Sequence, residues 1–474
     1  MGMTDLCWKT VAEAGAMLRN REVTSVELTE ATLARIGTTD PVLHAYASLM
    51  TDSALEAARA ADRDFAAGVD RGPLQGIPVG VKDLLRTAGH PTSAGSRVIE
   101  GYVPDDDAVV VAKLRAGGAV IVGKTVTHEF AYGQDKPPTR NAWATDCYPG
   151  GSSAGSGVAL AAGTAYAAIG TDTGGSVRAP AAVNGIVGLK PTHGRTSTRG
   201  VFPMSPTLDT VGPMARTVRD VALLLGVIAG PGLPDRDGYT DQGAIAEPVP
   251  DYAAALGGDL TGVRIGVERD YFFYPSVAQD VRTRVDDAIR TLADRGATIV
   301  EVTVANLDLA VPAGMAVLLG DTSEWHQRYL RERGDLYTPG VRAMLELGEL
   351  VLATAYVRAQ KVRRVVQRSY RAAFEAYQLD ALAAPTLPVT TMPVEQLDVD
   401  LTDSGEAATS SFIHHNFLAN VVGVPSLSVP VGFDRDTKPV GMQLYGRPFG
   451  EPELFRIGHA YQEATDWHEH HPAL

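Results

Sequence analysis

Two serines that each close a Gly-Gly-Ser turn are the residues of this sequence best suited to chemistry. Ser152 and Ser176 both follow a pair of glycines, and an apolar, alanine-rich segment separates the two turns. Glycine permits backbone conformations that a Cβ forbids, and it leaves amide N–H groups uncovered. Such a turn can hold a hydroxyl beside hydrogen-bond donors, which is the arrangement that acyl transfer requires. The pattern therefore indicates a serine nucleophile.

A lysine at the end of an apolar segment is a candidate base. Residues Pro73 to Val81 are apolar and punctuated by glycine and proline, which predicts a strand that delivers Lys82 at its end. One interpretation is a surface lysine whose ammonium reaches water beyond its apolar stem. The other is a desolvated amine whose charged form is disfavoured, so that it can accept a proton.

In their order along the chain, these features resemble the amidase signature family of serine hydrolases. The resemblance covers most of the chain and includes the further stretches Gly123 to Thr125, Glu129-Phe130, Leu208 to Pro213, Ala384 to Thr386 and Gly441 to Arg447. It implies that Ser176 is the nucleophile, Ser152 the bridging serine and Lys82 the base. It also implies a cis peptide bond before Ser152, and an oxyanion hole built from the backbone N–H groups of Thr173, Gly174, Gly175 and Ser176.

Other residues are candidates for supporting roles. Ser153, Asp172 and Arg178 are expected to orient the two turns, although simple stabilisation of the loops explains them equally well. An apolar pocket that tolerates aromatic substrates is a further hypothesis. Its proposed lining is His128, Phe130, Tyr132, Trp143 and Trp325.

Two short motif matches compete with this interpretation. Residues Gly118 to Thr125 satisfy the phosphate-loop pattern G-x-x-x-x-G-K-T, but the four intervening residues prefer a buried strand to a loop with free N–H groups. Residues Gly151 to Gly155 satisfy the G-x-S-x-G pattern, which would make Ser153 the nucleophile. A strand should lead directly into that turn, yet Tyr148-Pro149 precedes it. Both alternatives are disfavoured.

Charge and cysteine content limit the partners and cofactors that we expect. The chain has 42 basic and 56 acidic residues, a net charge of −14 spread along its length, which disfavours a nucleic-acid surface. The expected partner is a small amide, ester or carbamate, with no nucleic acid, and a homodimer stays open. Only Cys7 and Cys147 are present, and no histidine spacing completes a ligand set, so no metal or cofactor is expected.

The sequence also bears on location. The first residues lack the basic and apolar regions of a signal peptide, and no apolar run is long enough to span a bilayer. We therefore expect a cytoplasmic protein with no membrane contact.

The expected fold is of the α/β class: a single large domain over residues 1–474, with a mixed twisted sheet covered by helices on both sides. Residues 262–302 show a strand, helix, strand pattern typical of such folds. Helices predicted at Thr24 to Ile36 and Ser53 to Ala67 place an N-terminal helical part, residues 1–68, against the body. A mostly helical segment, residues 310–377, is expected near the substrate cleft.

The predicted activity is hydrolysis of a carboxylic amide C–N bond through an acyl-enzyme, with aryl amides, esters and carbamates as further substrates. The alternative is the glutaminase component of an aminoacyl-tRNA amidotransferase, which would share the Ser-Ser-Lys triad but work in an assembly. Residues 127–133 depart from that branch, which favours the free enzyme. A binding protein without turnover is disfavoured because all three triad residues are present.

Overall fold

One mixed sheet of 11 strands forms the centre of the computed structural model, which describes residues 3–132, 136–230, 247–397 and 408–474. The strand order is β1-β3-β2-β4-β6-β5-β10-β11-β9-β7-β8, with both parallel and antiparallel neighbours. The strands are β1 Tyr46–Leu49, β2 Pro78–Lys82, β3 Val120–Thr125, β4 Ala167–Asp172, β5 Val187–Lys190, β6 Thr210–Ala215, β7 Arg264–Val267, β8 Thr298–Glu301, β9 Ala381–Pro385, β10 Ser426–Phe433 and β11 Pro439–Tyr445.

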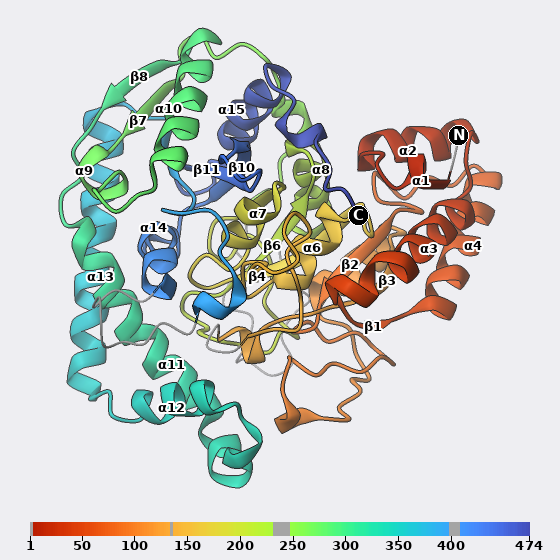
Figure 1. The fold of residues 1–474 in the computed structure, drawn as a ribbon, viewed down its shortest axis with the longest axis horizontal. Helices are drawn as coiled ribbons and strands as arrows, with labels where there is room; N and C mark the ends of the chain where they lie inside the picture. The colour runs from red at the N-terminus through yellow and green to blue at the C-terminus, as the bar shows by residue number, and fades with distance from the viewer. Residues whose placement is uncertain (1–2, 133–135, 231–246, 398–407) are drawn as a thin grey trace.

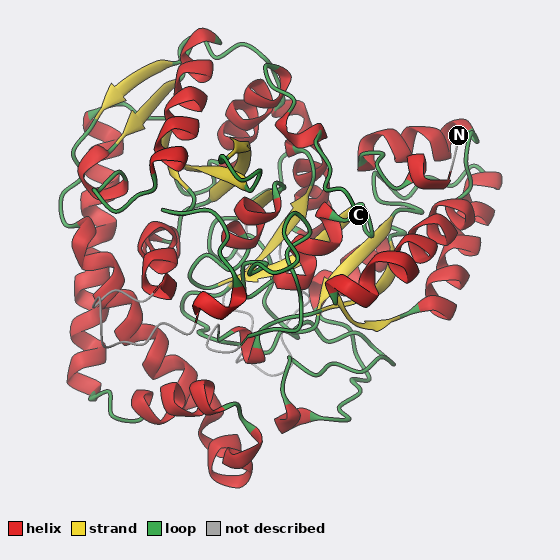
Figure 2. Cartoon of the chain, viewed as in Figure 1, coloured by secondary structure: helices red, strands yellow, loops and turns green. Residues whose placement is uncertain are grey.

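Helices flank this sheet, as Figures 1 and 2 show. They are α1 Met3–Leu6, α2 Val11–Asn20, α3 Ser25–Leu43, α4 Thr51–Ala66, α5 Val109–Ala116, α6 Ala154–Ala161, α7 Arg178–Asn184, α8 Val218–Ile228, α9 Arg269–Phe272, α10 Gln279–Asp294, α11 Ala310–Arg333, α12 Pro339–Gly348, α13 Ala353–Ala376, α14 Ala408–Val422 and α15 Glu451–Glu463. The α/β fold class predicted from the sequence is confirmed. Within the described part of the chain, no helix is both long and apolar enough to cross a membrane.

The N-terminal part contains the expected helices but also a strand. Thr24 caps α3 in a capping box, because its side chain accepts the N–H of Glu27 and the Glu27 carboxylate accepts the N–H of Thr24. Besides its helices, this part contains β1, which pairs antiparallel with β3 at the sheet edge.

Two parallel central strands position the candidate site. β2 and β4 are neighbours, and every residue of both strands is buried. β2 ends with Lys82, and the turn that carries Ser176 follows β4. Because the carboxyl ends of parallel strands meet at one edge of a sheet, residues distant in sequence come together there.

The phosphate-loop match lies in a strand. Gly123 and Lys124 belong to β3, where Lys124 is fully buried and forms an ion pair of 3.0 Å with Asp83. A Cβ at Gly123 would lie 2.7 Å from the carbonyl oxygen of Ser48 on β1, so close strand packing explains this glycine. The segment therefore offers no loop of free N–H groups to a phosphate.

Candidate active site

Lys82 lies fully buried at the end of β2, with its amine between two hydroxyls. Its Nζ is 2.8 Å from Ser152 Oγ and 2.8 Å from Thr171 Oγ1. Burial lowers the pKa of Lys82 to about 7, because removal from water penalises the charged form, and the negative charges of Asp172 and Asp209 offset part of this effect. The amine is therefore poised to exchange a proton near neutral pH, and the surface-lysine interpretation is excluded.

The turn before α6 holds Ser152 against this amine. Gly150 has a φ of +76°, and a Cβ there would lie 2.6 Å from Pro180 Cα, so both conformation and space require glycine. The Gly151–Ser152 peptide bond is cis. The neighbouring Ser153 is tied to β4 instead, since its hydroxyl donates to the carbonyl oxygen of Thr171 and accepts the N–H of the same residue, both at 3.2 Å.

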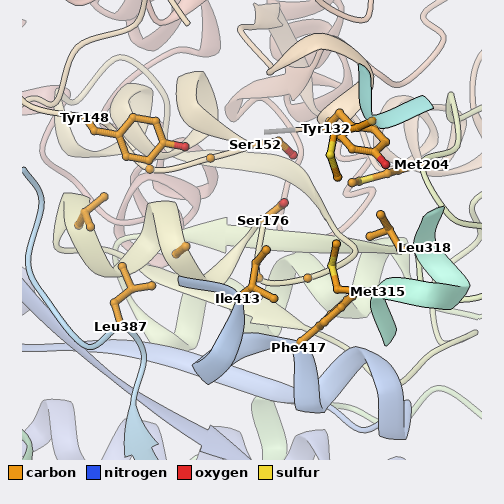
Figure 3. A pocket seen from close by; sticks show the side chains of 18 residues that line it. Tyr132, Tyr148, Ser152, Ser176, Met204, Met315, Leu318, Leu387, Ile413 and Phe417 are labelled. Carbon is orange, nitrogen blue, oxygen red and sulfur yellow. The ribbon is translucent and has the colours of Figure 1, made fainter. Parts of the chain in front are cut away.

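Ser176 faces the same cavity as Ser152, and Figure 3 shows the two side chains close to one another in its wall. Among the four backbone donors expected for an oxyanion hole, that of Gly175 is engaged, because its N–H donates to Asp172 Oδ1 at 2.9 Å. The N–H groups of Thr173, Gly174 and Ser176 have no hydrogen-bond acceptor among the described residues. The donor set available to an oxyanion is therefore reduced from four to three.

Asp172 and Arg178 form a fully buried ion pair beneath the Ser176 turn. The Asp172 carboxylate accepts two hydrogen bonds from Arg178 and one each from the N–H groups of Gly175 and Val177. Burial by itself would raise the pKa of the Asp172 carboxyl, but the Arg178 guanidinium holds that pKa well below its usual range. A permanent carboxylate thus fixes the backbone on both sides of Ser176.

Removal of this carboxylate should destabilise the fold. We expect Asp172→Ala to lower the free energy of unfolding by about 3–5 kcal/mol, because it leaves a buried guanidinium without its counter-charge. Urea denaturation measures the change. As a control, Asp335→Ala removes one of the two carboxylate partners of Arg342 at a 95% exposed position. The free energy of unfolding should hardly change, because exposed ion pairs contribute little. Equal effects at the two positions would contradict a structural role for the buried pair.

The structure adds contacts that sequence analysis missed. Thr173 donates a 2.6 Å hydrogen bond to Asp209, whose carboxylate also accepts the N–H groups of Met204 and Ser205. Burial raises the pKa of Asp209 to about 6. Asp209 thereby links the Ser176 turn to the pocket wall at Met204. Asp209 lies in the stretch Leu208 to Pro213, which resembles the amidase signature family. That resemblance was the one sequence signal for Asp209.

The far side of the Asp172–Arg178 pair is closed by two amides. Arg178 donates to Gln443 Oε1 at 3.0 Å and to Asn420 Oδ1 at 2.9 Å, and Asn420 returns a hydrogen bond to Asp172. These residues lie on β11 and α14, more than 200 positions from the turn that they brace. No local pattern connects such distant residues.

The cavity beside the serines is largely apolar. Methionine, leucine, isoleucine and phenylalanine side chains form much of its wall, contributed by Met204, Met315, Leu318, Met344, Leu387, Ile413 and Phe417. The described residues that line it include no charged side chain. Three helices supply five of these residues: α11 and α12, which are neighbours in the sequence, and α14, which is distant from both. This wall is the part of the site that sequence analysis did not find.

Of the five residues expected to line the pocket, the structure places only Tyr132 there. His128 is fully buried behind the wall, with its Nε2 3.2 Å from the hydroxyl of Tyr148. Phe130 packs inside an aromatic cluster with its ring 4.5 Å from that of His326. These residues were expected in the pocket because they are aromatic. Aromatic side chains pack in cores as readily as they line pockets, and their positions in the sequence do not distinguish the two.

The two tryptophans also lie elsewhere. Trp143 donates its ring N–H to the carbonyl oxygen of Asn184 and packs against Phe433. Trp325 lines a separate surface cavity with Arg86 and Tyr329. Among the described residues, no group of three or more histidine, cysteine, aspartate or glutamate side chains is placed to hold a metal ion.

Comparison with known proteins adds to this geometry. The family model described as Amidase matches residues 27–455. A glutamyl-tRNA(Gln) amidotransferase subunit from Chloroflexus aggregans is 42% identical, with 100% of this chain and 99% of that protein covered. An amidase from Pseudomonas putida is also 42% identical, with the same coverage. The crystal structure of a peptide amidase from Stenotrophomonas maltophilia superimposes with a TM-score of 0.83 at 34% identity, covering 96% of each chain.

These relatives correct the expectation about partners. Small molecules alone, with no nucleic acid, were expected, yet several proteins similar over the whole chain are named as subunits of a glutamyl-tRNA(Gln) amidotransferase. Their names support the amidotransferase alternative more than the stand-alone amidase. The expectation failed because a net charge of −14 sums the whole surface and records neither a local basic region nor a partner protein.

The family model covers most of the chain, and both curated and structural relatives match it from end to end. Their names describe enzymes that act on amides or transfer amide groups. The chain therefore belongs to the amidase signature family of amide-hydrolysing enzymes.

Proposed function

We propose that this enzyme cleaves its amide through an acyl-enzyme on Ser176, with Ser152 and Lys82 as a proton relay. The observation that carries the proposal is the buried Lys82 amine, 2.8 Å from Ser152 Oγ, with its pKa lowered to about 7 by burial. Both serines face one cavity. A neutral amine that reaches a nucleophile through a second hydroxyl is a general base near neutral pH.

The relay accounts for both bond changes. Ser176 Oγ attacks the carbonyl carbon while its proton passes to Ser152, and the proton of Ser152 passes to neutral Lys82. The new C–O bond places negative charge on the carbonyl oxygen, where the N–H groups of Thr173, Gly174 and Ser176 would stabilise it. The relay then runs backward and protonates the nitrogen as the C–N bond breaks. Water hydrolyses the resulting ester by the same steps and restores Ser176.

The first candidate substrate is the side-chain amide of glutamine, with the chain acting as the glutaminase component of a tRNA-dependent amidotransferase. The names of the similar full-length proteins support this setting. In it, Ser176 would take the γ-glutamyl group and release ammonia for transfer by the assembly. The triad needs no change for this reaction, because the bond broken is again an amide C–N bond.

The second candidate substrate is an apolar amide, and the cavity itself supports it. Free glutamine carries an ammonium and a carboxylate, and their burial against methionine, leucine and phenylalanine side chains without partners is costly. Met315 and Leu318 of α11 and Met344 of α12 instead suit an aliphatic or aromatic acyl group. The Pseudomonas putida protein, which is named simply as an amidase, is as similar to this chain as the amidotransferase subunits are.

One assay distinguishes these settings. Ammonia release by the purified chain is measured with glutamine and with hexanamide at equal concentrations, and labelling by a fluorophosphonate reports an active nucleophile independently of the substrate. Release from hexanamide but not glutamine supports the apolar amide, and the reverse supports the glutaminase. Absence of labelling in a folded chain would overturn the proposed nucleophile in either setting.

A pocket variant tests the apolar substrate directly. Leu318→Ala should lower kcat/KM for hexanamide relative to acetamide by roughly 10-fold or more, because a longer acyl chain loses apolar contact when the side chain is shortened. The readout is the ratio of the two kcat/KM values. Leu345→Ala is the matched control, since Leu345 is buried on α12 but does not line the cavity. An unchanged ratio in Leu318→Ala would argue against an apolar acyl site.

A further inference from the structure

The exposed side of α13 carries a row of positive charges, here called the basic face. Its members are Arg358, Lys361, Arg364, Arg368 and Arg371, all exposed. Their spacing of three or four residues places them along one side of the helix. The opposite side packs into the core through residues such as Val366 and Tyr370. In Figure 1, α13 runs along the outer edge of the molecule, which agrees with the exposure of these five side chains.

This row is unfavourable for the isolated chain. Each cation has another cation three or four residues away, and like charges at that spacing destabilise a helix. The five side chains form no ion pair or hydrogen bond with any described residue. Some exposed arginines elsewhere are paired, such as Arg328 with Glu332 on α11. The one carboxylate of α13, Glu375, lies beyond the C-terminal end of the row.

We propose that the basic face binds the phosphate backbone of RNA. The row spans about 20 Å at ~1.5 Å per residue, enough for several successive phosphates. Four of its five members are arginines, whose planar guanidinium groups match phosphate oxygens in pairs. A protein partner would need an apolar contact core. The exposed Leu347, Leu350, Leu352 and Val357 all precede the row, and no large exposed hydrophobic side chain lies within it. RNA therefore fits the face better than an acidic protein does.

The basic face is separate from the amide site. None of its five residues lines the cavity beside Ser176. α13 nevertheless packs against α11 and α14, which supply Leu318 and Phe417 to that cavity. RNA on the outer side of α13 would thus leave the cavity free. The inference does not require the chain to be a glutaminase, so the two proposals can fail independently.

The test is the binding of fluorescently labelled bulk tRNA, measured by anisotropy over a salt series. The variant Arg364→Gln/Arg368→Gln/Arg371→Gln should bind at least about 10-fold more weakly at low salt. The slope of log K against log salt should fall by roughly 2, about 0.7 for each phosphate that the variant no longer neutralises. Glutamine preserves helix propensity. The melting temperature should be equal or higher because repulsion is relieved, and amide turnover should not change.

The matched control removes the same charge elsewhere, in Arg290→Gln/Arg328→Gln/Arg435→Gln, three exposed arginines outside α13. This control should retain the affinity and the salt slope of the natural chain. Equal weakening by both variants would overturn the proposal, as would a natural chain that binds no tRNA at low salt. If polyglutamate of matched charge competes as strongly as unlabelled tRNA, the face is a site for an acidic protein and the assignment to RNA is wrong.

Discussion

Replacement of Ser176 with alanine is expected to abolish acyl-enzyme formation and to reduce kcat for amide hydrolysis by on the order of 10⁶-fold. The reason is that the Ser176 hydroxyl lies in the cavity wall on the same turn as the N–H groups of Thr173 and Gly174, which have no acceptor among the described residues. Intact-mass spectrometry after incubation with a fluorophosphonate should show one adduct on the natural chain and none on the variant.

Ser153→Ala is the matched control, because it removes a hydroxyl that lies only one position from Ser152. The Ser153 hydroxyl contacts the backbone of Thr171 and does not line the cavity. Its loss should cost about 1 kcal/mol of stability and leave a measurable rate with normal labelling. If the adduct maps to Ser153 and survives in Ser176→Ala, the G-x-S-x-G interpretation is correct and the proposed triad is wrong.

Replacement of Lys82 with alanine should lower kcat for an amide by roughly 10²–10⁴-fold, since the relay loses its base. Esters need less help with their leaving group than amides, so the loss for a matched ester should be smaller. Steady-state rates on an amide and an ester with the same acyl group provide the comparison. Equal losses would mean that Lys82 only shapes the Ser152 turn, and the relay would have to be abandoned.

The pH dependence follows from the state of the Lys82 amine. The neutral form accepts the proton, and burial lowers the pKa of Lys82 to about 7. Since the neutral fraction grows as the pH rises, kcat/KM should increase through a midpoint near that pKa and reach a plateau in the alkaline range. Below the midpoint, the rate should fall about tenfold per pH unit.

Two variants separate Lys82 from groups that titrate in the same range. Burial also lowers the pKa of Lys190 to about 7, but its Nζ donates to the carbonyl oxygen of Pro191 and to neither serine of the proposed triad. Lys190→Met should therefore leave the midpoint unchanged. The charge of Asp209 raises the Lys82 pKa, so Asp209→Asn should move the midpoint to lower pH. If the midpoint shifts in Lys190→Met, Lys190 and not Lys82 controls the pH dependence of kcat/KM.

Local chemistry along the chain was enough to predict the catalytic candidates. The pairs of glycines before Ser152 and Ser176, and the apolar strand before Lys82, depend on residues adjacent in sequence, where steric limits and burial act directly. The α3 start at Thr24 was predicted for the same reason, because a capping box spans only four residues. The order of these stretches also indicated the family, which the family model confirms.

The pocket wall, the bracing of the turns and the distribution of charge were decided by tertiary structure. Leu318 and Phe417 meet beside Ser176 only because α11 and α14 pack together, and nothing near either residue in the sequence records that contact. The packing also put Phe130 in the core. Net charge was misleading for the same physical reason, because a sum over the chain does not say which charges share a surface. Packing of one side of α13 leaves five of its basic residues together on the other side.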